Sequence, residues 1–350
     1  MNKGAEFWLR ISIVCLICII IFLDPAILFP FILSLIIAVL LNPVALWIHG
    51  QANRLCHGRF PYDVAIILSF LVFLTVIYMI IIHILVPFVS EFREFMKSFP
   101  STLAALQQAI PAAEAEYQFN LLPPEARNVI SKILSDVGEY TLKIAQFSLS
   151  AIFSFASTVV ELIVVPFITF YMMKKGGYVV ESFIKLFPDR FRTHLRELFK
   201  ETHSVLNAYI RGQLILSALM AFLVFLGMFL LDIPYPLVIG LVAGLVEMVP
   251  IIGPVIGAIP PVLLGLLKGT GVMVQVIIFY VVVQQLDSHF IMPKLMGHVI
   301  DVHPVAIIAG VLVGGHLFGV LGMMISVPTV AILQIILRHM WFYDRYKSLR

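Results

Sequence analysis

Charged side chains are scarce in this chain of 350 residues, where Asp, Glu, Lys and Arg together make up 12%. Soluble domains usually carry about 25%. Hydrophobic residues make up 61%, and the mean hydropathy is +1.04. The formal net charge of +3 is small and its basic residues are spread along the chain, which argues against nucleic acid as a partner. The composition predicts a polytopic membrane protein.

Cysteines and catalytic motifs are also few. Cys15, Cys18 and Cys56 cannot form a disulfide framework, and Cys15 and Cys18 lie in an apolar run without the further ligands that a metal site needs. The patterns HExxH, GxSxG and GxxxxGK[ST] do not occur. We therefore expect no catalytic residues, no cofactor and no metal site, and we do not expect an enzyme.

Long apolar runs predict about eight transmembrane segments, since about 20 helical residues cross the hydrocarbon core. The segments are expected at residues 7–23, 26–47, 62–89, 147–173, 205–231, 233–268, 272–291 and 305–337. Glycines and Pro328 interrupt the last run, so one tilted helix and two half-helices both stay open. The expected fold is an all-α polytopic membrane protein with a Pro/Gly-broken helix hairpin and a small extracytoplasmic helical arm.

Polar segments divide the chain. The expected parts are residues 1–89 with three transmembrane segments, 90–146 as an extracytoplasmic amphipathic helical insert, 147–173 as the fourth segment, 174–204 as a cytoplasmic amphipathic segment, 205–337 as the C-terminal transmembrane region, and 338–350 as a basic tail. Basic residues prefer the cytoplasmic side. Their distribution predicts that both termini are cytoplasmic.

The stretch 233–268 combines apolar composition with one carboxylate, Glu247, and six prolines. Hydrocarbon offers no water to a charge or to a backbone group freed by proline, so such a stretch is expected among other helices or beside a cavity. Pro250, Gly253 and Pro254 are expected to break the helix. The alternative is a structural hairpin whose glutamate is simply paired.

Four polar residues are candidates for a proton or cation relay: Glu247, Asp287, Gln284 and Glu161. Gln284 and Asp287 share a helix face with Tyr280, and Glu161 shares one with three serines. Intramembrane carboxylates are functional candidates by default. An ion pair of Glu247 or Asp287 with Arg211 or Lys294 is the structural alternative.

Small residues predict where helices approach one another. Gly240 and Gly244 form a GxxxG pair, and Glu247 continues that face. Further packing and helix-breaking positions are expected at Pro293, Gly315 and Gly319. These glycine faces and the amphipathic arm are compatible with a homo-oligomer.

Three segments of the sequence resemble the autoinducer-2 exporter (AI-2E) family, also called the PerM family. They are YIRGQL, GLVAGLVEMVPIIGPVIGAIPPVLLGLL and QQLDSHFIMPKLMGHVIDVHPVAIIAGVLVGGHLFGVLGMMISVP. The positions that match residues characteristic of the family are Glu247, Pro250, Gly253, Pro254, Gln284, Asp287, Pro293, Gly297, Pro304, Gly315, Gly319, Gly322 and Pro328. His289 differs, because many members have a smaller polar residue there.

The resemblance implies a multi-pass transporter of the bacterial inner membrane. Members are linked to export of the autoinducer-2 signal or to exchange of sodium or lithium for protons. The expected function is export of a small polar solute, with ion or proton coupling, and the expected partners are membrane lipid and a small polar solute or monovalent cation. A Na⁺(Li⁺)/H⁺ antiporter is the first alternative, and a non-transporting scaffold or channel is the second.

Overall fold

The computed structural model describes residues 28–55, 57, 59–116, 159–296 and 302–341, and within them the secondary structure is helical, without strands. The chain begins with α2 (Leu28–Leu55), α3 (Tyr62–Ile80), the π-helix η2 (Ile81–Leu85) and α4 (Val86–Glu116). It continues with α6 (Val159–Ile184) and α7 (Asp189–Leu230). The predicted segment at 7–23 lies outside the described residues.

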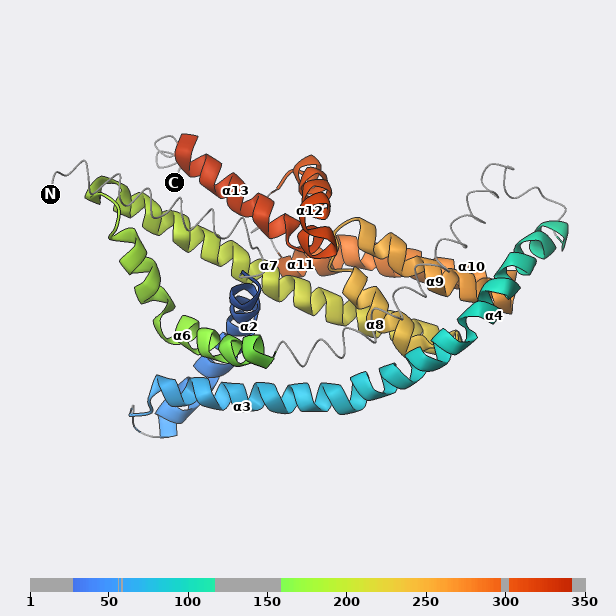
Figure 1. The fold of residues 1–350 in the computed structure, drawn as a ribbon, viewed down its shortest axis with the longest axis horizontal. Helices are drawn as coiled ribbons and strands as arrows, with labels where there is room; N and C mark the ends of the chain where they lie inside the picture. Colours follow the sequence, from blue (N-terminus) through green and yellow to red (C-terminus); the bar gives the residue numbers. More distant parts are fainter. Residues whose placement is uncertain (1–27, 56, 58, 117–158, 297–301, 342–350) are drawn as a thin grey trace. The chain divides into compact units, whose positions relative to one another are not determined.

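The C-terminal part consists of shorter helices. They are α8 (Pro236–Val246), α9 (Ile252–Lys268), α10 (Thr270–Leu286), the π-helix η3 (Asp287–Ile291), α11 (Met292–Met296), α12 (Pro304–Met324) and α13 (Ser326–Trp341). Figure 1 traces this order from α2 to α13. Proline and glycine interrupt these segments more often than the earlier ones, which shortens the helices.

By length and composition, five described helical stretches could cross a membrane: Pro30–Leu55, Tyr62–Ser98, Phe191–Leu230, Thr270–Met296 and Pro304–Met324. The last of these contains the break at Gly319 described below. The chain is therefore a multi-pass helical protein. α7 contains 42 residues, or about 60 Å of helix, which is twice the hydrocarbon thickness. It joins the second half of the predicted cytoplasmic amphipathic segment, from residue 189, to the predicted span at 205–231 without a break.

The described residues fall into two compact units. The first consists of the described residues of 28–77, 159–210 and 335–341. In it α2 packs against α6, where the Ser34 hydroxyl donates to the carbonyl of Val165 at 3.1 Å and the Thr169 hydroxyl donates to the same carbonyl at 2.8 Å. Buried hydroxyls in an apolar helix pair need such backbone acceptors, because no water is available to replace them.

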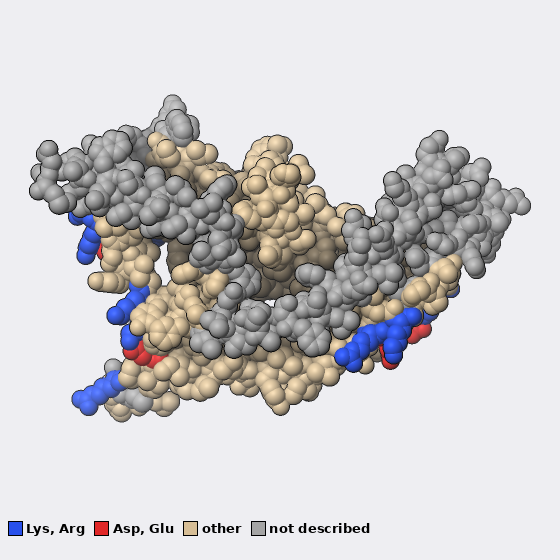
Figure 2. Space-filling model, in the orientation of Figure 1, with Lys and Arg blue, Asp and Glu red and all other residues tan. Residues whose placement is uncertain are grey.

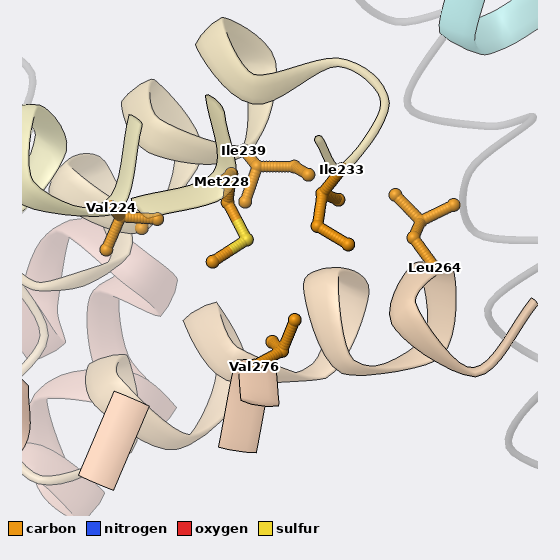
Figure 3. Close-up of a cluster of buried hydrophobic side chains, with 7 residues drawn as sticks. Val224, Met228, Ile233, Ile239, Leu264 and Val276 are labelled. Atoms are coloured by element: carbon orange, nitrogen blue, oxygen red, sulfur yellow. The ribbon is translucent and has the colours of Figure 1, made fainter. Parts of the chain in front are cut away.

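The second unit consists of the described residues of 78–116 and 211–334 and contains the main apolar cluster. Figure 3 shows Val224, Met228, Ile233, Ile239, Leu264 and Val276 converging from α7, α8, α9, α10 and the loop before α8. Between membrane helices the transfer of apolar groups from lipid contributes little, so close packing has to hold such a cluster together.

Glycines let helices of this unit approach closely. A Cβ atom on Gly240 would lie 2.7 Å from the carbonyl oxygen of Ala221, and one on Gly244 would lie 2.6 Å from that of Ser217. α8 therefore lies directly against the backbone of α7.

Gly319 breaks α12 with φ of 60° and ψ of −143°. Beyond the break the chain turns back, since a Cβ on Gly322 would lie 2.0 Å from the carbonyl oxygen of Gly314. Residues 305–337 thus form a helical hairpin and not one tilted helix.

Adding a methyl group at Gly244 should destabilise the protein. Gly244→Ala places a Cβ 2.6 Å from Ala221 Cβ, and overpacking of this kind costs about 1–3 kcal/mol. Gly271→Ala is the matched control, because nothing lies within 4 Å of its Cβ. Thermal unfolding in detergent, followed by size-exclusion chromatography, should show a lower Tm for Gly244→Ala alone. Equal Tm values for the two variants would contradict the close packing of α7 and α8.

Candidate functional site

The α8–α9 hairpin turns at residues 247–251, directly after Glu247 has closed α8. Ile251 has a φ of 69°, and a Cβ on Gly253 would lie 2.2 Å from the carbonyl oxygen of Val246. Glycine is required at position 253, because any side chain would meet the backbone of the opposite helix. Of the three residues predicted to break the helix, Pro250 lies in this turn, whereas Gly253 and Pro254 lie in the first turn of α9. Glu247 is at the tip of the hairpin.

The tip cannot reach across a bilayer. α8 contains 11 residues, or about 16 Å of helix, whereas the hydrocarbon core measures about 30 Å. If the base of the hairpin lies at the interface, Glu247 lies within the hydrocarbon region.

Asp287 lies at the level of this tip. α9 and α10 contain 17 residues each and are joined by Gly269 alone, whose φ of 130° favours glycine. The two helices run side by side in opposite directions, and the Tyr280 hydroxyl donates to the Gly257 carbonyl at 3.0 Å. Asp287 follows the last residue of α10, so it lies opposite the first residues of α9.

Asp287 opens η3, a single π-helical turn of five residues. Such turns are rare and occur often at functional sites, because the wider turn changes the direction of the side chains that follow. Asp287 is buried within it, whereas Ser288 and His289 are exposed.

Glu247 and Asp287 are both buried, with exposed fractions of 8% and 4%. They lie at the same end of the hairpin, since Glu247 precedes the turn into α9 and Asp287 lies opposite the first residues of α9. Among the described residues neither carboxylate forms an ion pair, so the expected alternatives Arg211 and Lys294 do not neutralise them there. Within the same part of the chain, Asp287 Oδ1 has no hydrogen-bond partner.

Two polar side chains hold the hairpin around these carboxylates. The Gln213 amide Nε2 donates to the main-chain carbonyl of Glu247 at 3.1 Å. The Tyr280 hydroxyl bonds to the Gly257 carbonyl of α9, as described above. Neutral donors therefore bind two backbone carbonyls of the hairpin, those of Glu247 and Gly257. In the described part of the chain the two carboxylates have no countercharge.

The other predicted site residues lie in several places. Gln284 donates to the Ser288 hydroxyl at 3.5 Å, and Glu161 belongs to α6 in the first unit. Pro293 lies in α11, and Gly315 and Gly319 lie in α12. The structure thus brings together Glu247 and Asp287, and it places Glu161 in a different unit.

The base of the hairpin carries an ion pair outside the membrane-spanning helices. Lys268 Nζ lies 2.6 Å from Asp232 Oδ2. The hydrogen bond from Lys268, and then its charge, lower the pKa of Asp232 below its usual range. Because the pKa is lowered in the folded protein, the contribution of this pair to stability is present at neutral pH and is lost as the pH falls through the lowered pKa.

The sequence did not single out Gln213 or the π-helical turn. Gln213 lies in YIRGQL, a segment that the resemblance had already marked, but nothing in its spacing connects it to a position 34 residues later. The polar run from Gln284 to His289 was the one visible sign of an irregular turn.

Long apolar helices, two hairpins and a buried carboxylate pair define a multi-pass helical membrane protein. The chain matches the family described as AI-2E family transporter over residues 10–341 and belongs to this family. The curated relatives it resembles are named for transport. It is 28% identical to the candidate transport protein YueF of Bacillus subtilis (strain 168) over 310 residues, covering 87% of this chain and 82% of YueF. It is 25% identical to the candidate transport protein YrrI of the same strain, covering 89% of this chain and 85% of YrrI. It is 22% identical to the candidate permease PerM of Escherichia coli (strain K12), covering 72% of this chain and 67% of PerM.

Removing the Gln213 amide should loosen the tip of the hairpin. Gln213→Ala leaves the buried carbonyl of Glu247 without this donor, which should cost about 1 kcal/mol, the scale measured for hydrogen bonds between membrane helices. Gln275→Ala, at an exposed position of α10, is the control. A lower Tm for Gln213→Ala than for Gln275→Ala is the expected result, and identical values would contradict a structural role for this bond.

Proposed function

We propose that the protein transports a small polar solute across the bacterial inner membrane, most simply as an exporter of an autoinducer-2-like signal, and that Glu247 and Asp287 couple this transport to protons or cations. The observation that carries the proposal is the pair of buried carboxylates at a broken helix, without a basic partner among the described residues. Membership of the transporter family and the names of the relatives support the general class.

The coupling follows from electrostatics. Two negative charges close together and away from water repel each other and lose hydration, so a state with both ionised and nothing bound is unfavourable. A proton or a monovalent cation relieves this cost. Any movement of the hairpin that separates Glu247 from Asp287, or admits water between them, changes the affinity for that ion and thereby links the movement to ion binding.

Na⁺(Li⁺)/H⁺ antiport is the second candidate. It is favoured by the chemistry of the site, since carboxylate and carbonyl oxygens are suitable ligands for a small cation, and Asp287 Oδ1 is free to accept one within the described part of the chain. In this case the ion that binds at the carboxylates is itself the transported substrate.

Everted membrane vesicles distinguish these candidates. If the carboxylates carry coupling, Glu247→Gln and Asp287→Asn should each lower the transport rate by about tenfold or more, equivalent to roughly 1.4 kcal/mol. Glu94→Gln, at an exposed position of α4, should behave as the wild type. The antiport arm measures the response of a pH-sensitive dye to added sodium or lithium. The export arm measures the autoinducer-2 retained by cells with and without the protein.

A cation-dependent dye response that both site variants abolish supports antiport. Retention of the signal in cells that lack the protein, without a dye response, supports export. Transport at the wild-type rate by both site variants would exclude them from the coupling mechanism. The absence of any response in both arms would favour a scaffold or channel.

A further inference from the structure

The first turn of α8 lacks an N-cap from its own sequence. Tyr235 precedes the helix and makes no capping hydrogen bond with its side chain, and Pro236 occupies the first turn. The first four amides of an α-helix have no intrahelical acceptor, and the loss is greatest where water is absent. Val238 in this turn is buried, so its N–H needs an acceptor from elsewhere in the chain.

Glu91 of α4 supplies this acceptor. The main-chain N–H of Val238 donates to Glu91 Oε2 at 2.8 Å, across a separation of 147 residues. The site suits a carboxylate, because the N-terminus of a helix carries partial positive charge. Figure 1 shows α4 passing α8 and α9, and contacts join α4 to both helices.

Two further residues of α4 lie on the same face, four and seven positions after Glu91. Phe95 packs its ring edge-on against that of Tyr235, with centroids 5.3 Å apart. The Ser98 and Tyr235 hydroxyls form a hydrogen bond of 2.7 Å. One face of α4 thus makes three contacts with the base of the hairpin: with the ring of Tyr235, with its hydroxyl, and with the backbone N–H of Val238.

The base that α4 contacts is strained. Asp232 and Tyr235 have φ of 55° and 60°, in the left-handed region that side chains other than glycine rarely adopt. Such conformations persist only where surrounding contacts impose them. At Asp232 the contact is Lys268, and at Tyr235 it is α4. The backbone of this loop therefore depends on these contacts to keep its strained conformation, and with it the position of the hairpin.

We propose that Glu91, Phe95 and Ser98 are positioning residues, which hold the α8–α9 hairpin so that Glu247 at its tip stays beside Asp287. The hairpin is attached through a strained loop at residues 231–235, and α4 fixes its base. Release of this contact lets the loop relax and moves the tip away from Asp287. The link to coupling rests on the proposed function, whereas the positioning itself does not.

The neighbouring charges on α4 do not share this role. Arg93, Glu94 and Lys97 are exposed, and Figure 2 shows a group of charged side chains along the outer side of this helix. Glu94 lies three positions after Glu91 in the same helix and has the same carboxylate side chain, so it provides a matched control.

The test compares Glu91→Ala, Glu91→Gln and Glu94→Ala in the purified full chain in lipid nanodiscs. Hydrogen exchange measured by mass spectrometry reports the amides of α8, and labelling by dicyclohexylcarbodiimide reports the Glu247 carboxyl. Glu91→Ala should raise exchange in the first turn of α8 by roughly five- to thirtyfold and alter the labelling rate of Glu247 severalfold. Glu91→Gln should bring both the exchange rate in α8 and the labelling rate of Glu247 back close to the wild-type values, because its amide oxygen still accepts from Val238 N–H. Glu94→Ala should match the wild type in both measurements.

Neither measurement requires transport, so a failure of the proposed function leaves this test intact. Unchanged exchange in Glu91→Ala would overturn the proposal. Faster exchange with unchanged labelling of Glu247 would overturn it as well, because Glu91 would then act only as a local cap.

If Glu91→Ala does not fold, Ser98→Ala and Tyr235→Phe take its place, since each removes one side of the same hydrogen bond. Similar changes in the labelling of Glu247 for both, with no further change in the double variant, are expected. Independent, additive effects or no effect would overturn the proposal.

Discussion

The structure depends on one constraint: a helix broken inside an apolar environment must find partners for every backbone group that the break frees. At the tip of the α8–α9 hairpin the Gly253 N–H donates to the Val249 carbonyl at 2.9 Å, and Gln213 reaches the Glu247 carbonyl from α7. On the flank of the hairpin, Tyr280 reaches Gly257 from α10. Water would meet these needs in a soluble protein, but here neighbouring helices meet them, so α7 and α10 must lie where they do.

The same constraint explains why the two carboxylates matter. Burial removes the hydration of Glu247 and Asp287, and the described neighbours supply neutral donors to the backbone but no basic group to the acids. Such a pair contributes nothing favourable to stability when both groups are charged. This arrangement therefore supports the proposed coupling of Glu247 and Asp287 to protons or cations.

Small residues determine how closely the helices approach. Gly240 and Gly244 bring α8 onto the backbone of α7, and Gly314 and Gly322 bring together the two arms of the hairpin formed by residues 305–337. Lipid solvates apolar side chains as well as a protein interior does, so close contact between backbones replaces hydrophobic burial as the source of specificity. The two hairpins follow the same rule, with a glycine near each turn, yet carboxylates occur beside the tip of the first.

The sequence alone determined the class of the protein, because apolar runs of this length have few alternatives to membrane helices. It also predicted the break at Pro250 to Pro254 and selected Glu247 and Asp287, because charge and proline are costly in hydrocarbon. Only the tertiary structure decided that these two acids lie together, that Gln213 and Tyr280 support the hairpin, and that Glu91 reaches α8 from 147 residues away. Helical periodicity predicts which residues share a face of a helix, but it does not predict which other helix packs against that face. In a membrane protein the faces toward lipid and toward other helices are both apolar, so composition does not distinguish them, and packing makes the choice.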